Sequence, residues 1–544
     1  MKPLYLTTLV SIVLAGSLAP AYKDPLVDLD YGIFQGKYDE TYNISYFRKV
    51  PYAAPPTGEN RFRAPQPPLE ISDGVYDTDQ DFDMCPQRTV NGSEDCLYLG
   101  LFSRPWNTEN TRGAAARRPV LVVFYGGAFI QGSASFTLPP SSYPILNATT
   151  LNDYVVIYPN YRLNAFGFLP GKAIKDSPTS DLNPALLDQE YVLKWVQKHI
   201  THFGGDPRNV TVWGQSAGGG SVVAQVLANG RRRGQKKLFN KAYASSPFWP
   251  KTYRYNDPEA EAIYEQFVSL TGCGDARDSL KCLKSVDVQT IRDANLVIAA
   301  GNTYTTSSYT WAPVVDESFL LETLSDAVTH DRIETDYIFT TYNTHEGENF
   351  IPPGFNYNDS SASADGFNSS AASFHAWLKA FLPGLSSREI KLLEEKYYPV
   401  SGETETLDSY NSTYVRAGLV YRDVVLACPA YWLSSGAAKK GYIGEYTIDP
   451  AKHASDTIYW NRINSVQQTN PLVYKGYAGA MGSFFQTGDP NAHKLTDATV
   501  VGVPELQRSG KEFVIREDGF DNVEITLLRE RCEFLRKVGD RVPV

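Results

Sequence analysis

The chain has little of several features that would point to other kinds of protein. Its 544 residues hold 51 Lys and Arg against 61 Asp and Glu, and the resulting net charge of -10 argues against a nucleic-acid partner. The six cysteines and seven histidines show no spacing typical of a structural zinc site, so we expect no metal and no cofactor. No internal repeat is visible, and no later apolar run reaches the roughly 20 residues that span a bilayer.

The first 21 residues have the pattern of a secretory signal peptide. Lys2 precedes an apolar stretch from Leu4 to Leu18, and residues 19–21 (Ala-Pro-Ala) supply the small residues of a cleavage site. The alternative is an uncleaved anchor, but the stretch is shorter than a bilayer span. We therefore expect a signal peptide at residues 1–21 and a secreted, extracellular protein without a stable membrane anchor.

The remaining chain, residues 22–544, has the composition of a folded enzyme-sized domain. The whole sequence has 42% hydrophobic and 21% charged residues, and this hydrophobic fraction is enough to form a large buried core. Strand and helix patterns continue through it without a break that resembles a linker. We expect a single domain, because α/β folds often exceed the usual domain length of about 150 residues.

Cysteines and glycosylation motifs agree with a secretory route. Six cysteines allow fifteen pairings, and the simplest scheme has two short loops and one long crosslink that ties the C-terminus to the body. Seven Asn-x-Ser/Thr motifs are candidates for glycans on exposed loops. They begin at Asn43, Asn91, Asn147, Asn209, Asn358, Asn368 and Asn411.

The middle of the chain alternates between buried strands and amphipathic helices. Residues 120–125 and 154–158 are continuous apolar runs, typical of strands that are buried on both faces. Residues 184–203 follow a helical period, and residues 336–341 and 444–448 read as further strands. This order predicts a mostly parallel sheet covered on both faces, with ligands bound beyond the carboxyl ends of its strands.

One motif at such a strand end predicts a nucleophile. Residues 210–213 (Val-Thr-Val-Trp) read as a strand, and residues 214–218 (Gly-Gln-Ser-Ala-Gly) form a G-x-S-x-G turn before a helix. The glycines allow a strained turn that presents Ser216 to a cleft, at a helix N-terminus that favours negative charge. A glycine-rich turn that contains serine by chance is the alternative.

A serine nucleophile needs a histidine base and an acid, and on this kind of fold they follow the serine in the order acid, then histidine. His453 comes shortly after the strand at 444–448, whereas His493 lies in a polar loop, so we expect His453 to be the base. Glu346 follows the strand at 336–341 and precedes Gly347, which would allow a sharp turn. Its rivals as the acid are Glu348 and Asp316.

Together these residues resemble the type-B carboxylesterase/lipase family of α/β-hydrolases, which includes cholinesterases and secreted fungal carboxylesterases. The resemblance extends over almost the whole mature chain. It rests on the elbow and on the segments 51–56, 61–63, 93–97, 160–162 and 203–207.

The resemblance implies an α/β-hydrolase fold with a large, mixed, mostly parallel central sheet, helices on both faces, and inserted loops over an active-site gorge. It implies a triad of Ser216, Glu346 and His453, and an oxyanion hole of backbone N–H groups. The hole residues would be Gly127, Ala128 and Ala217. The implied disulfides are Cys85–Cys96, Cys273–Cys282 and Cys428–Cys532.

Three departures from the family pattern bear on specificity. Ala128 stands where the family loop usually has a third glycine, so the methyl group would narrow the acyl side. Gln215 replaces the glutamate of cholinesterases, and the loop between Cys85 and Cys96 has no tryptophan to stack on a quaternary ammonium, which argues against choline esters. The same loop is too short to serve as a lipase lid.

We therefore expect a secreted serine carboxylesterase that hydrolyses soluble or modest-sized esters. A lipase, or an acyl-transfer or natural-product-specific esterase on the same triad, remains an alternative. A non-catalytic adhesion or binding module is the alternative of another class, although such modules typically lose the nucleophile. The expected partner is a small-molecule ester, and the expected state is a monomer or a homodimer.

Overall fold

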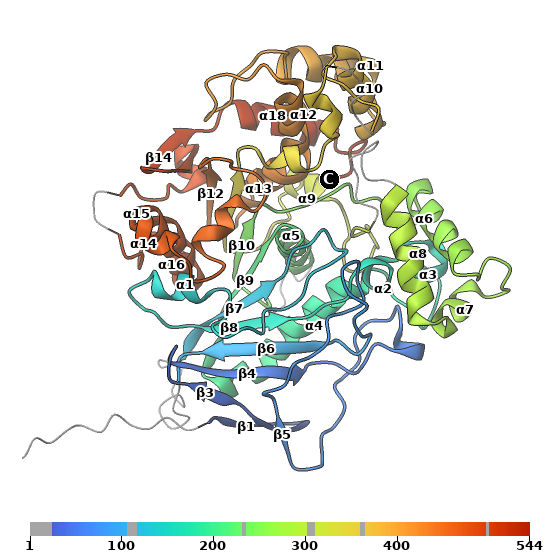
Figure 1. Cartoon of the computed structure of the whole chain (residues 1–544), viewed down its shortest axis with the longest axis vertical. Coiled ribbons are helices and arrows are strands. Elements are labelled where there is room, and N and C mark those ends of the chain that lie inside the picture. The colour runs from blue at the N-terminus through green and yellow to red at the C-terminus, as the bar shows by residue number, and fades with distance from the viewer. Residues whose placement is uncertain (1–23, 106–116, 231–235, 302–310, 359–364, 497–499) are drawn as a thin grey trace, which may run out of the picture.

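The computed structural model describes residues 24–105, 117–230, 236–301, 311–358, 365–496 and 500–544 (Figure 1). The signal peptide that the sequence predicts lies outside these residues. Eleven of the described strands form one sheet in the order β14-β13-β12-β11-β10-β9-β7-β8-β6-β4-β3, and three form a small second sheet, β1-β2-β5. The strands are β1 (Leu26–Leu29), β2 (Gly32–Gln35), β3 (Lys37–Asp39), β4 (Ile44–Pro51), β5 (Val75–Asp77), β6 (Tyr98–Ser103), β7 (Arg118–Phe124), β8 (Val155–Pro159), β9 (Gly205–Gln215), β10 (Lys241–Ser245), β11 (Tyr337–Asn343), β12 (Lys440–Tyr446), β13 (Lys511–Arg516) and β14 (Gly519–Glu524).

The helices connect these strands and cover the large sheet. Within the described residues the α-helices are α1 (Tyr143–Asn147), α2 (Asn164–Phe168), α3 (Lys172–Lys175), α4 (Pro184–His199), α5 (Ala217–Gly230), α6 (Pro258–Leu270), α7 (Ser279–Ser285), α8 (Val288–Gly301), α9 (Leu324–Thr329), α10 (Ala371–Phe381), α11 (Ser387–Leu392), α12 (Thr413–Arg422), α13 (Cys428–Ser435), α14 (Val466–Thr469), α15 (Pro471–Val473), α16 (Gly479–Thr487), α17 (Leu506–Ser509) and α18 (Leu527–Lys537). A 3-10 turn, η4 (Glu346–Asn349), follows β11.

The middle of the large sheet is parallel and its edges are antiparallel. From β8 through β7, β9, β10, β11 and β12 to β13, every neighbouring pair is parallel. The edge strands β14, β6, β4 and β3 pair antiparallel. The predicted α/β-hydrolase architecture, a mixed and mostly parallel sheet with helices on both faces, is confirmed.

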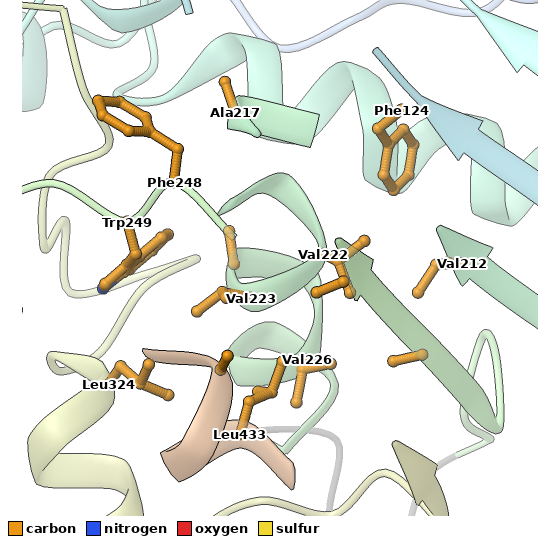
Figure 2. Packing of buried hydrophobic residues seen from close by; sticks show 14 of the residues in the cluster. Phe124, Val212, Ala217, Val222, Val223, Val226, Phe248, Trp249, Leu324 and Leu433 are labelled. Atoms are coloured by element: carbon orange, nitrogen blue, oxygen red, sulfur yellow. The ribbon is translucent and has the colours of Figure 1, made fainter. Parts of the chain in front are cut away.

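The continuous apolar strands are buried because both of their faces are covered. In β7, Val120, Val122 and Phe124 belong to one core cluster, while Leu121 and Val123 belong to another on the opposite face. Helix α5 packs on the first face, where its valines lie among Trp249, Leu324 and Leu433 (Figure 2). Helix α16 packs on the second face against β7 and β9. This double coverage holds the carboxyl ends of β9, β11 and β12 in fixed register.

The predicted strands at 120–125, 154–158 and 336–341 differ from β7, β8 and β11 by one or two residues at each end, and two others differ by more. The elbow strand is longer than predicted, because β9 begins at Gly205 rather than near Val210. The strand predicted at 444–448 is β12, which runs from Lys440 to Tyr446. It begins earlier because residues from Lys440 onward pair with β11 from Tyr337 onward. Gly441 at its start fits closely against α13, where an added Cβ would lie 1.8 Å from the carbonyl oxygen of Ser434.

The cysteines pair as the resemblance implies. Disulfides join Cys85 to Cys96 and Cys273 to Cys282, which close two short loops. The third, Cys428–Cys532, joins α13 to the C-terminal helix α18. A crosslink across this long loop restricts the unfolded chain most strongly, so it is the disulfide with the largest entropic contribution to stability.

Candidate functional site

The turn between β9 and α5 forces Ser216 into a strained conformation. Its φ of 59° lies in the left-handed region, which non-glycine residues rarely adopt. Neighbouring segments approach so closely that a Cβ added at Gly214 would lie 2.2 Å from the backbone of Gly218, and one at Gly218 would lie 2.1 Å from the carbonyl oxygen of Phe124. Both glycines of the motif are therefore required by close packing.

His453 links Ser216 to Glu346. Its Nε2 lies 2.8 Å from Ser216 Oγ, and its Nδ1 lies 2.9 Å from Glu346 Oε2. The backbone N–H of His453 donates to Asn349 Oδ1 at 2.9 Å, which ties the histidine loop to the turn that carries the acid. The three residues predicted from the sequence therefore lie together at the carboxyl edge of the sheet.

Glu346 begins the turn η4, directly after β11, and its side chain is fully buried. Its second carboxylate oxygen, Oε1, accepts the backbone N–H of Asn343 at 3.2 Å. A turn is present at Gly347, but the φ of this residue is not positive, so the turn does not use the left-handed conformation that favours glycine. A Cβ at Gly347 would lie 1.9 Å from the carbonyl oxygen of Gly418 in α12, so close helix packing requires glycine there.

The rival residues lie elsewhere or have other partners. His493 Nδ1 is 3.1 Å from Thr150 Oγ1, away from the elbow. Glu348 binds His345 and Lys452. Asp316 accepts backbone N–H groups of the turn that follows it, among them that of Leu320 at 3.0 Å. None of these contacts joins a rival to Ser216.

The three backbone N–H groups expected to form the oxyanion hole are available as donors, and the segment that carries two of them approaches the nucleophile, since a Cβ added at Gly126 would lie 3.1 Å from Ser216 Cβ. Gly127 and Ala128 belong to the glycine loop, which we define as residues 126–132, and Ala217 is the first residue of α5. Among the described residues, no hydrogen bond uses the N–H group of any of the three. Ala128 has a φ of 55°, so the alanine adopts the left-handed conformation that a glycine would adopt at lower cost.

Gln87, which the sequence analysis missed, holds the end of the glycine loop. The side chain is buried, and its Oε1 accepts the N–H of Gly132 at 2.9 Å while its Nε2 donates to the carbonyl oxygen of Gly132 at 3.0 Å. Gln87 lies in the disulfide loop between Cys85 and Cys96, and the N–H of the next residue, Arg88, donates to the carbonyl oxygen of Ile130. The disulfide loop is thereby bound to the glycine loop at two points.

Two more side chains surround the histidine. The Gln215 amide Nε2 is 3.5 Å from His453 Nε2, so this position places no charge beside the imidazole. The Phe350 ring meets the imidazole edge to face at 5.0 Å. Behind them, burial raises the pKa of Asp456, whose Oδ1 accepts from the Asn343 side chain at 3.4 Å. Sequence reasoning missed Asp456 and Asn349, because nothing local marks either residue.

The predicted glycosylation sites differ in accessibility. Asn43, Asn91, Asn358 and Asn411 are exposed, whereas Asn147, Asn209 and Asn368 are half-buried. At Asn209 the buried Lys241 ammonium donates to the side-chain oxygen, and the side-chain nitrogen donates to the carbonyl oxygen of Gln486 at 3.2 Å. A glycan on Asn209 would take one of the two hydrogens of this half-buried amide nitrogen and would need space beside the contact with Gln486. Occupancy of all seven sites stays a prediction.

The described ranges contain neither a membrane-spanning helix nor a cluster of metal ligands. No helix in that part of the chain is both long and apolar enough to cross a membrane. In the same ranges, no group of three or more His, Cys, Asp or Glu side chains is arranged to hold a metal ion.

A nucleophile elbow at the carboxyl edge of this sheet is the arrangement of the α/β-hydrolase class, and comparison with known proteins narrows the class to one family. A model of the carboxylesterase family matches residues 23–534. The chain belongs to the carboxylesterase family and is a carboxylic-ester hydrolase.

Individual relatives agree with this assignment. The chain is 28% identical to carboxylesterase patB of Penicillium expansum over 530 residues, which cover 86% of this chain and 88% of the relative. It is 29% identical to secreted lipase 4 of Gibberella zeae over 487 residues, or 84% of this chain and 82% of the relative. Among solved structures, Aspergillus niger EstA superposes with a TM-score of 0.78 at 25% identity, covering 96% of this chain and 99% of EstA.

Proposed function

We propose that this enzyme hydrolyses soluble or modest-sized esters through Ser216, His453 and Glu346. The observation that supports the proposal most directly is the continuous hydrogen-bonded path from the serine hydroxyl through both imidazole nitrogens to a buried carboxylate. A hydroxyl becomes a strong nucleophile only when an imidazole takes its proton, and the carboxylate stabilises the resulting imidazolium.

In the first half of the proposed reaction, Ser216 Oγ attacks the ester carbonyl carbon while His453 Nε2 takes the hydroxyl proton. The carbonyl oxygen becomes an oxyanion, which accepts hydrogen bonds from the N–H groups of Gly127, Ala128 and Ala217. Each donor of this kind is worth about 10²- to 10³-fold in rate. His453 then gives the proton to the alcohol oxygen. The alcohol leaves, and the acyl group remains bonded to Ser216 Oγ as an acyl-enzyme.

In the second half, water replaces the alcohol. His453 takes a proton from the water molecule as its oxygen attacks the acyl carbon, and the same N–H groups stabilise the second oxyanion. Collapse of this intermediate returns the proton to Ser216 Oγ and releases the acid. Acyl transfer differs only in that another alcohol or an amine takes the place of water.

The short disulfide loop favours an esterase over a lid-gated lipase. Only ten residues separate Cys85 from Cys96, and Gln87 and Arg88 bind this loop to the glycine loop. A segment fixed in this way is a poor candidate for the large opening movement of a lid. Several relatives are named secreted lipases, so the chain length of the preferred acyl group needs direct measurement.

Replacement of the nucleophile tests the proposal. Ser216→Ala should lower turnover of p-nitrophenyl acetate by about 10⁶-fold, since a triad acts as a unit. The matched control is Ser221→Ala, which removes a serine in α5 that bonds Gln189 and the carbonyl oxygen of Ala217. A Ser216→Ala enzyme that keeps more than about a hundredth of the wild-type rate would contradict the proposal.

A series of p-nitrophenyl esters from acetate to palmitate tests the substrate class. We expect the rate to fall with long acyl chains and to show no jump when the substrate forms an emulsion. A preference for palmitate with such a jump would instead identify a lipase. Products formed in the presence of competing alcohols and amines would identify an acyltransferase.

We also propose that the protein is secreted after removal of residues 1–21. The predicted signal peptide, the three disulfides and the name of the Gibberella relative support this. Recovery of active enzyme from the culture medium with an N-terminus near Tyr22 is the expected result. The single domain at 22–544 and the monomeric or dimeric state remain predictions.

A further inference from the structure

A small cavity lies between helix α8 and the glycine loop. Its lining includes Ile130 of the loop, Asn164 at the start of α2, Asn295 of α8 and Trp311. The cavity leaves about 10 Å³ for the centre of a water-sized sphere, which is close to the space that one water molecule needs. Any occupant of this space must therefore be very small.

Three of the residues that line the cavity each have a buried polar atom without a hydrogen-bond partner among the described residues. These atoms are Asn164 Oδ1, Asn295 Nδ2 and Trp311 Nε1. Their side chains are at most 4% exposed, so bulk solvent does not satisfy these atoms. A buried polar atom without a hydrogen-bond partner lowers the stability of the fold. Because three residues that line one cavity each have such an atom, we expect a bound molecule that satisfies them.

The orientation of both amides is fixed by their other atoms. Asn164 Nδ2 donates to the carbonyl oxygen of Pro86 at 3.2 Å, which leaves Oδ1 as the unpartnered acceptor. Asn295 Oδ1 accepts the backbone N–H of Ala165 at 3.0 Å, which leaves Nδ2 as a donor. With the indole N–H of Trp311, the cavity offers two donors and one acceptor.

We propose that this cavity binds one ordered water molecule. A water molecule accepts from Asn295 and Trp311 and donates to Asn164, so it satisfies all three atoms. A monatomic anion has no proton for Asn164 Oδ1, and a metal cation cannot accept from the two N–H groups. Water is therefore the smallest ligand whose hydrogen-bonding groups match the cavity.

The bound water braces the glycine loop, and this second part of the inference rests on the proposed function. The N–H of Asn164 donates to the carbonyl oxygen of Phe129 at 2.8 Å, so Asn164 holds the residue next to Ala128. Through the water, Asn164 is joined to α8 and Trp311. The position of the donor at Ala128 then depends on the water-filled cavity.

A crystal structure of the mature protein, at a resolution that reveals ordered water, tests the binding site. One water within hydrogen-bond distance of Asn164 Oδ1, Asn295 Nδ2 and Trp311 Nε1 is the expected result. An empty cavity, or any other ligand in it, would overturn the proposal. This result does not depend on catalysis, so a retained rate in Ser216→Ala would refute the proposed function and leave the water site standing.

Kinetics of Trp311→Phe test the brace, since this change removes one donor and keeps most of the ring. We expect kcat for p-nitrophenyl acetate to fall about 10-fold at unchanged KM, less than the roughly 100-fold that a 1 Å misplacement can cost. Trp432→Phe is the matched control, because it removes another buried, unpartnered indole N–H outside this cavity. Equal kcat in the two variants would overturn the bracing role.

Discussion

Two sets of buried carboxylates lie beside strands β11 and β12, and their partners give them opposite roles. In the triad, Glu346 is paired with the imidazole of His453, which in turn reaches a serine hydroxyl. The other set, which we call the ion network, pairs its carboxylates with guanidinium groups and hydroxyls. The ion network consists of Glu405, Arg422, Asp423, Glu445, Glu512 and Arg531.

The ion network fixes charge in place. Asp423 accepts from Arg422 at 2.8 Å and from Arg531 at 2.6 Å, and the two arginines hold the pKa of Asp423 below its usual value in spite of burial. Guanidinium groups keep their protons at any pH of interest, so this part of the network cannot pass a proton on. Its contribution is to join α12 to the C-terminal helix α18.

The two sets touch at the turn that carries Glu346, the proposed catalytic acid. Arg422 Nη1 donates to the carbonyl oxygen of Thr344 at 3.2 Å, and the Thr344 hydroxyl donates to Glu445 at 2.7 Å. The ion network therefore supports the backbone two residues before Glu346. Equally buried carboxylates thus have different partners: Glu346, whose proposed role is to orient and stabilise an imidazole, accepts from His453, and Asp423 forms a crosslink between guanidinium groups.

The largest effect that separates the two sets is expected from Glu346→Gln. The amide keeps the shape of the side chain but removes the charge that stabilises the His453 cation, so kcat should fall by about 10⁴-fold with little change in the free energy of unfolding. Glu348→Gln is the control, because Glu348 lies two residues away and binds His345 instead. A Glu346→Gln enzyme whose kcat lies within tenfold of wild type would show that Glu346 does not take part in the mechanism.

The parts of the site that could be predicted from sequence are those with a local pattern. The elbow is five consecutive residues, and the need for Gly214 and Gly218 follows from that short turn. His453 and Glu346 could be selected because each follows a strand end. The offset in β12 did not affect the choice, since parallel strands bring their carboxyl ends to one edge.

The parts that could not be predicted depend on contacts between distant segments. Gln87 reaches Gly132 across 45 residues, and Arg531 reaches Asp423 across 108, with no local signature for either contact. Gly347 shows the same limit, because its close neighbour belongs to α12. A single sequence indicates that a residue is small or charged, but it does not indicate what packs against it.

Asp423→Asn in the ion network is expected to have a smaller effect than Glu346→Gln, and to lower stability instead of kcat. The change leaves two buried arginines without their shared carboxylate, so the free energy of unfolding should fall by about 3 to 5 kcal/mol. The kcat of the folded enzyme should stay close to wild type, because Asp423 does not contact the triad.

For Asp423→Asn, urea unfolding measures the free energy of unfolding, and the maximal rate divided by the active-site concentration from titration gives kcat. Asp336→Asn is the control, since that carboxylate pairs with Lys237 and Lys439 at a more exposed place and should matter by at most about 1 kcal/mol. A large loss of kcat without a loss of stability would mean that the ion network takes part in catalysis.

The smallest expected effect comes from Glu512, a member of the ion network whose hydrogen-bond partner is a tyrosine hydroxyl rather than an arginine. Burial raises the pKa of Glu512 well above its usual value, and the nearby carboxylates of Glu445 and Glu405 raise it further. Its Oε2 accepts from the Tyr342 hydroxyl at 2.8 Å, while Oε1 is buried with no partner in the described structure.

The raised pKa of Glu512 gives stability a definite dependence on pH. Below pH 4.5 the side chain is protonated in both the folded and the unfolded chain, and as the pH rises only the unfolded chain releases the proton, so the free energy of unfolding falls. Glu512→Gln removes this loss. We expect the variant to exceed wild type by about 0.5 to 2 kcal/mol at pH 8, with the difference vanishing toward pH 4.5, as measured by urea unfolding at each pH. A constant difference at all pH values would show instead that packing, rather than the proton on Glu512, sets the effect.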